Sequence, residues 1–130
     1  MIQSLATVAL AVADYDEAIA YFTRRLGFAL LADMPLGEGR RWVLVAPDGG
    51  KGARLLLVKA EGAEQSARVG NQTGGRVGFF LETSDFGRDH AAYKAQGVTF
   101  LEEPRHEPYG TVAVFEDLYG NKWDLIEPRG

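Results

Sequence analysis

The chain has 130 residues, enough for one compact domain, and its hydrophobic and charged contents of 46% and 25% are usual for a globular protein. Its formal net charge of −4 gives no positive footprint for nucleic acid or for an anionic membrane surface. The sequence contains no cysteine, which excludes disulfides, thiolate metal ligands and a cysteine nucleophile.

The apolar runs of the chain predict no membrane anchor. The N-terminus enters a strand pattern directly, without the basic region and apolar core of a secretory leader. No apolar run approaches the roughly 18 residues that a transmembrane helix needs. A cytoplasmic protein with no membrane partner is therefore expected.

The first part of the chain predicts a strand, a helix and three further strands. Leu5–Val12 is apolar at nearly every position, as in a strand covered on both faces. Asp14 can cap the helix that follows, Glu17 is placed for a capping box, and Gly27 ends the helix. Turns at residues 35–39 and 47–52 separate three predicted strands, Phe28–Asp33, Arg41–Ala46 and Arg54–Lys59.

A polar, glycine-bearing segment without clear periodicity follows at Glu61–Gly75. We interpret it as a linker, part of which can form a short helix. A functional lid is the alternative, because a linker of this length is unusual inside a compact domain.

The second part of the chain repeats the order of the first. The predicted elements are a strand at Arg76–Thr83, a helix at Asp85–Gln96, and strands at Thr99–Glu102, Thr111–Glu116 and Lys122–Glu127, with a proline-bearing loop at Glu103–Tyr109. Phe86, Ala92 and Tyr93 are candidates for the buried helix face, and His90 is expected to be exposed.

The two halves are therefore copies of one unit. Thr7–Asp14 and Gly78–Asp85 are both strand-like runs that end in an acidic helix cap. The repeat predicts an α+β fold in one domain, residues 1–130, built from two tandem βαβββ modules at about 1–60 and 76–130. The modules are expected to form a curved mixed sheet around a cleft, where pockets tend to occur.

Two segments carry a resemblance to a known family. Val8–Phe22 with Leu26–Phe28, and Tyr109–Gly110 with Phe115–Glu127, resemble the opening and the close of vicinal oxygen chelate proteins. This superfamily contains glyoxalase I, extradiol dioxygenases, fosfomycin-resistance enzymes and bleomycin-binding proteins, and the resemblance extends from Leu5 to Pro128. It implies paired βαβββ modules around an open cleft, and a homodimer.

The resemblance also implies where a divalent metal would be held. The family's ligands are a histidine in the first strand of one or both modules and a carboxylate or glutamine near the end of each module. In this sequence those positions are Thr7, Gly78, Leu56 and Asp124, so only Asp124 matches. No metal cofactor is therefore expected. The alternative is a metal-dependent glyoxalase-like lyase or dioxygenase with a rearranged ligand set of Glu82, His106 and Asp124.

Without a metal, the cleft is expected to bind a small molecule of unassigned identity. If Asp124 and Glu82 face each other, one of them gains a raised pKa and can act as a catalytic acid or base, in a lyase or isomerase reaction. Glu127 should face away from the cleft. Two alternatives to a catalytic role remain. The protein could sequester an antibiotic without turnover, or it could be an assembly partner whose cleft is filled by its own side chains. The predicted ligand-binding residues are Thr7, Trp42, Gly78, Phe80, His106 and Tyr109.

Overall fold

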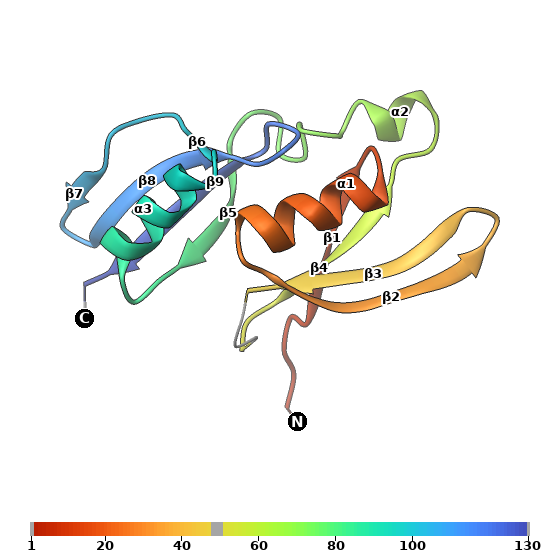
Figure 1. Cartoon of the computed structure of the whole chain (residues 1–130), viewed down its shortest axis with the longest axis horizontal. Helices are drawn as coiled ribbons and strands as arrows, with labels where there is room; N and C mark the ends of the chain where they lie inside the picture. Colours follow the sequence, from red (N-terminus) through yellow and green to blue (C-terminus); the bar gives the residue numbers. More distant parts are fainter. Residues whose placement is uncertain (1, 48–50, 130) are drawn as a thin grey trace. The chain divides into compact units, whose positions relative to one another are not determined.

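The structure is a computed structural model that describes residues 2–47 and 51–129. The chain divides into two compact units, Met1–Val69 and Gly70–Gly130, and the boundary falls inside the predicted linker (Figure 1). The predicted turn at residues 47–52 lies partly outside the described residues. No helix in the described part of the chain is long and apolar enough to cross a membrane.

The first unit contains the predicted strand, helix and three strands. Its sheet has the order β1-β4-β3-β2, in which β1 and β4 are parallel and the other pairs antiparallel. Helix α1 packs on β3 and β4 (Figure 1). The elements are β1 (Thr7–Val12), α1 (Tyr15–Ala20), a π-helical turn η1 (Tyr21–Arg25), β2 (Ala29–Gly37), β3 (Arg40–Ala46), β4 (Arg54–Lys59) and α2 (Gly62–Ser66).

The first helix begins and ends where the sequence predicts. The Asp14 carboxylate caps it by accepting a hydrogen bond of 2.9 Å from the backbone N–H of Glu17. Gly27 follows the helix with φ +71, a left-handed conformation that favours glycine. The sequence did not predict the wider turn of η1, where the N–H of Leu26 bonds the carbonyl of Tyr21.

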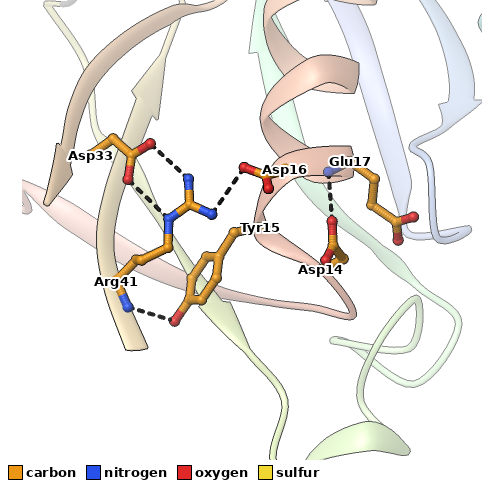
Figure 2. Close-up of polar contacts among 6 residues, drawn as sticks. All are labelled: Asp14, Tyr15, Asp16, Glu17, Asp33 and Arg41. Atoms are coloured by element: carbon orange, nitrogen blue, oxygen red, sulfur yellow. Dashed lines mark hydrogen bonds and ion pairs between the residues drawn. The ribbon is translucent and has the colours of Figure 1, made fainter. Parts of the chain in front are cut away.

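The side chain of Arg41 connects α1 to the sheet through hydrogen bonds. Arg41 on β3 donates from Nε and Nη2 to Asp33 on β2, at 3.1 and 2.7 Å, and from Nη1 to Asp16 on α1 at 2.9 Å (Figure 2). Its guanidinium lies 5.1 Å from the ring centroid of Tyr15, and its backbone N–H donates to the Tyr15 hydroxyl. One side chain therefore links both strands of the β2–β3 hairpin to the helix.

The second unit repeats this arrangement with one extra strand. Its sheet has the order β5-β9-β8-β6, β7 pairs with β8, and only β5 and β9 are parallel. The elements are β5 (Val77–Glu82), α3 (Phe86–Ala95), β6 (Thr99–Phe100), β7 (Arg105–Glu107), β8 (Gly110–Glu116) and β9 (Lys122–Pro128). Both mixed sheets and the α+β class agree with the prediction, but β7 lies in what was predicted to be a loop.

Aromatic side chains fill the space between α3 and its sheet. Phe115 on β8 contacts Phe100, Tyr93 and Trp123, with ring centroids 5.6–5.8 Å apart. His90 stacks on Phe86 at 5.3 Å and lies 4.4 Å from Phe100, so it is half-buried, not exposed as predicted. The helix turns this histidine toward the sheet and leaves Ala92 exposed, which corrects the prediction for Ala92.

The turn between β8 and β9 is organised by a buried aspartate. Asp117 accepts hydrogen bonds of 3.0 Å from the N–H groups of Tyr119 and Asn121, from the Asn121 amide and from Trp123 Nε1. The start of the second unit packs on this turn, because a Cβ placed on Gly70 would meet the carbonyl oxygen of Tyr119. This end of the predicted linker is therefore fixed in place.

Candidate functional site

Each sheet has one face covered by its own helix and one face that this helix leaves open. In the first unit the helix face carries the buried Leu10, Val43, Val45 and Leu57. Cross-strand partners share a face and neighbours along a strand alternate, so the strand register assigns every other residue to the open face. In the second unit Phe115, Trp123 and Leu125 face α3, and the alternate residues of the same strands lie on the open face.

The open face of the first sheet is apolar. Met34 and Trp42 are cross-strand partners on β2 and β3, and their side chains are 53% and 37% exposed. The next row across the sheet consists of aliphatic side chains, Ala32, Leu44, Leu56 and Ala9. Thr7 lies beside Arg54 at the edge of this surface. An exposed tryptophan on an apolar sheet face is typical of a binding surface.

The family's metal positions in the first unit do not fit a metal ion. Leu56 is surrounded by aliphatic side chains and has no donor atom, and Thr7 supplies only a hydroxyl. Imidazole and carboxylate are the usual side-chain ligands of divalent metals in proteins, and neither is present at these two positions. The open face of this unit therefore suits an apolar ligand.

In the second unit the position of Gly78 is explained by packing. A register shift in β5 lies between Val77 and Phe79, so Gly78 is the extra residue of a bulge. A Cβ placed on Gly78 would collide with the methyl group of Thr73, whose hydroxyl donates to the carbonyl of Arg76. Gly78 thus admits the Thr73 side chain rather than supplying a metal ligand.

The open face of the second sheet carries an aspartate between apolar neighbours. Asp124 on β9 pairs with Phe80 on β5 and with Val114 on β8. Phe80 is 65% exposed, the highest value among the large hydrophobic side chains of the sheet strands described. The next row contains Glu82, Ile126, Val112 and Arg105. The structure thus places Phe80, Glu82 and Asp124 on one face, as predicted from their spacing.

The Asp124 side chain on this surface has an unsatisfied hydrogen-bond acceptor. Its Oδ1 is buried and has no hydrogen-bond partner among the described residues. Burial raises the pKa of Asp124 above its usual value, the positive charge of Arg105 lowers it, and the negative charge of Glu102 adds to the rise. The carboxylate whose negative charge adds to this rise is Glu102.

Glu102 and Arg105 form an ion pair that was not predicted from the sequence. Arg105 Nε donates to both carboxylate oxygens of Glu102, at 2.9 and 3.1 Å, and Nη1 donates to Glu107 at 3.3 Å. Hydrogen bonds to Glu102 and Tyr109 raise the pKa of Arg105. Glu102 Oε2 also accepts from the N–H of Val114 at 3.0 Å, where the sheet lacks a strand partner. The i, i+3 spacing around Pro104 was the available signal.

The rearranged ligand set of Glu82, His106 and Asp124 does not come together. His106 pairs with Thr111, so it lies on the face opposite Asp124, and its Nδ1 is 3.3 Å from the Thr111 hydroxyl. Within residues 2–47 and 51–129, no group of three or more His, Asp or Glu side chains could hold a metal ion. Glu127 faces α3 as expected, because its Oε1 accepts from the N–H of Phe86 at 2.7 Å.

Residues 4–125 match the family described as the Glyoxalase/Bleomycin resistance protein/Dioxygenase superfamily. An uncharacterized protein of Shewanella frigidimarina (strain NCIMB 400) is 49% identical over 128 residues, which cover 98% of this chain and 95% of that protein.

Two solved structures share the fold over nearly the whole chain. UcmS2 is 32% identical with a TM-score of 0.83, over 97% of this chain and 98% of that chain. TnmS3, described as an antibiotic binding protein from Streptomyces sp. CB03234, is 31% identical with a TM-score of 0.78, over 98% of each chain.

Proposed function

Because the chain belongs to the Glyoxalase/Bleomycin resistance protein/Dioxygenase superfamily, we propose that it binds a small organic molecule with a large apolar or aromatic part, without a resident metal ion. The observation that carries this proposal is the exposure of large apolar side chains on sheet faces that their own helices leave open. Trp42 and Met34 lie on one such face, and Phe80 lies on the other.

Burial of apolar surface would supply the binding free energy. Removing apolar surface from water yields about 25 cal/mol per Å². An aromatic side chain has on the order of 150–250 Å² of surface, of which the exposed 37% at Trp42 and 65% at Phe80 can be covered by a ligand. A ligand that covers Trp42 or Phe80 therefore gains affinity without any charged contact. The apolar Leu56 and the packed Gly78, where metal-dependent relatives of this fold place ligands, support binding that needs no metal.

The similarity to TnmS3 supports a ligand of the antibiotic class. A polycyclic or otherwise aromatic natural product would match the exposed tryptophan and phenylalanine. Sequestration without turnover is the activity that this arrangement supports best, because affinity alone is sufficient for it.

A second candidate function is proton transfer by Asp124. Its raised pKa, caused first by burial, suits a general acid or base in a metal-free lyase or isomerase. Glu82 lies on the same face and is exposed, so it is the second carboxylate available to such a reaction. In a screen of candidate substrates, Asp124→Asn should abolish turnover while leaving ligand binding measurable.

Tryptophan fluorescence offers a direct test of the binding proposal. The chain has two tryptophans, of which Trp42 is exposed and Trp123 is buried and bonded to Asp117. Titration with bleomycin and with a panel of polycyclic aromatic antibiotics should quench or shift the emission of Trp42. The same titration of Trp42→Phe should leave the remaining emission unchanged.

A matched measurement of thermal stability completes the test. A ligand at one hundred times its Kd adds about 2.7 kcal/mol to the stability of the folded state. A compound that quenches Trp42 should therefore also raise the melting temperature of the wild type. If no compound in the panel changes either signal, the proposed function is wrong.

The proposal includes the homodimer and the cytoplasmic location expected for this protein. The cysteine-free composition is compatible with a reducing compartment. Light scattering coupled to size-exclusion chromatography should give twice the 14.2 kDa mass of the chain. A monomeric mass would remove the dimer from the proposal without affecting ligand binding.

A further inference from the structure

Asp124 is an acidic residue in an otherwise apolar row of the second sheet. Phe80 lies on one side of it and Val114 on the other, and neither side chain can donate a hydrogen bond. A buried acceptor that lacks a hydrogen-bond donor lowers the stability of the folded protein. Among the described residues, Oδ1 of Asp124 is the buried side-chain polar atom that has no hydrogen-bond partner.

A structural role does not account for this side chain. A structural carboxylate is held by donors, as Asp117 is by four hydrogen bonds and Glu127 by the N–H of Phe86. No such donor reaches Oδ1 of Asp124. The positive charge that acts on Asp124 is that of Arg105, and this guanidinium is already bonded to Glu102 and Glu107.

We propose that Asp124 is a specificity-determining residue that accepts a hydrogen bond from a protonated amine of the ligand, while the adjoining apolar part of the ligand packs on Phe80. This inference rests on the proposed function. It narrows the ligand class to aromatic compounds that carry a protonated alkylamine with at least one N–H. The unpaired oxygen supplies the acceptor, and the exposed ring of Phe80 supplies the adjacent apolar contact.

The ligand's hydrogen-bond donor should be positively charged because it lies beside the half-buried Asp124 carboxylate. A hydroxyl would satisfy the hydrogen bond of Oδ1 but would add no positive charge beside the half-buried carboxylate, whose neighbour Arg105 is already bonded to Glu102 and Glu107. An ammonium group does both, and charge-assisted hydrogen bonds are about twice as strong as neutral ones. A quaternary ammonium lacks the N–H and is therefore a poorer match.

The test compares two probes of equal shape, 1-naphthylmethylamine and 1-naphthylmethanol, on the full chain at pH 7. Affinities are measured by titration while backbone amide NMR signals are followed. The amine should bind roughly tenfold or more tightly than the alcohol, and the signals of β5 and β9 should shift. Asp124→Asn should bind both probes with the affinity that the wild type shows for the alcohol.

Two further variants separate the contributions. Glu64→Gln removes one negative charge from an exposed site on α2 and should keep the amine preference, which excludes an effect of net charge. Phe80→Ala should lower the affinity for both probes by a similar factor. Unchanged binding of the alcohol to Asp124→Asn also shows that this variant is folded.

The outcomes distinguish the two proposals. Equal binding of amine and alcohol by the wild type, or an amine preference that survives in Asp124→Asn, overturns the role of Asp124 and leaves the proposed function standing. Failure of both probes to bind counts against the proposed function and against the inference with it.

Discussion

Arg41 and Asp33 form a two-point contact across the β2–β3 hairpin. Nε and Nη2 of the arginine reach the two carboxylate oxygens at 3.1 and 2.7 Å, while Nη1 reaches Asp16 on α1 (Figure 2). This fork geometry is specific to arginine, because lysine offers one point charge in place of two parallel N–H groups. The pair therefore fixes the position of the hairpin relative to the helix.

Replacement of Asp33 by asparagine should lower the free energy of unfolding at neutral pH by about 1 kcal/mol. This is the upper end of what a solvent-accessible ion pair contributes to stability. The hydrogen bond from Arg41 lowers the pKa of Asp33 below 3.8, so the ionised carboxylate is favoured by folding. Its contribution is complete above the unfolded-state pKa and is lost as the pH falls through the lower folded-state value. Urea unfolding should show a larger difference in stability between wild type and Asp33→Asn at pH 7 than at pH 2.5.

Replacement of Asp124 by asparagine should have the opposite effect on stability. Burial raises the pKa of Asp124, so the ionised form is disfavoured in the folded state. This cost is present above the folded-state pKa and disappears as the pH falls below the unfolded-state value of 3.8. Asp124→Asn should melt on the order of 1–3 °C higher than the wild type at pH 7 and at the same temperature at pH 3. A lower melting temperature at pH 7 would contradict this account.

Replacement of Gly70 by alanine should be more costly than replacement of Gly74. Both residues have positive φ, +74 and +70, so both variants carry a backbone penalty of about 1 kcal/mol. Only at Gly70 would the new Cβ also collide with a backbone atom, the carbonyl oxygen of Tyr119. Chemical denaturation should show a loss of roughly 2–4 kcal/mol for Gly70→Ala and about 1 kcal/mol for Gly74→Ala. Equal losses would mean that the start of the second unit does not pack on the turn before β9.

Elemental analysis tests whether the protein retains a divalent metal. Purified protein would be dialysed against nickel, zinc, iron(II) and manganese, and then against metal-free buffer. Because Leu56 and Gly78 lack donor atoms and His106 lies on the face opposite Asp124, retention well below one ion per chain is expected. Retention of one ion per chain would contradict the metal-free proposal, and loss of that ion in Asp124→Asn would locate the site.

The elements of the fold could be predicted because local signals were strong. Asp14 and Asp85 both cap the helices they precede, with carboxylate oxygens accepting from the N–H three residues on. Apolar spacing located the strands at the core of each unit. Segment β7 was missed because its three residues contain two charges and a histidine, and its pairing with β8 is a tertiary effect.

The candidate site could be predicted only in part. The shared face of Phe80 and Glu82 followed from strand alternation, since both lie beyond the bulge at Gly78, and Asp124 was assigned to the same face from the family's ligand positions. The ion pair of Glu102 and Arg105 did not, because it depends on a gap between β6 and β7 that propensity does not encode. His106 was assigned to the site from its place in a predicted loop, and without the pairing of β7 with β8 there was no means of orienting its side chain.

The edge strand β2 has a consequence for how the protein behaves at high concentration. This strand ends the order β1-β4-β3-β2 and exposes Leu30, Leu31, Met34 and Leu36, a composition that invites aggregation by strand addition. Two register shifts distort its backbone, and Pro35 lacks the N–H that an incoming strand would need. The chain can therefore display an apolar edge without offering a regular template to other molecules.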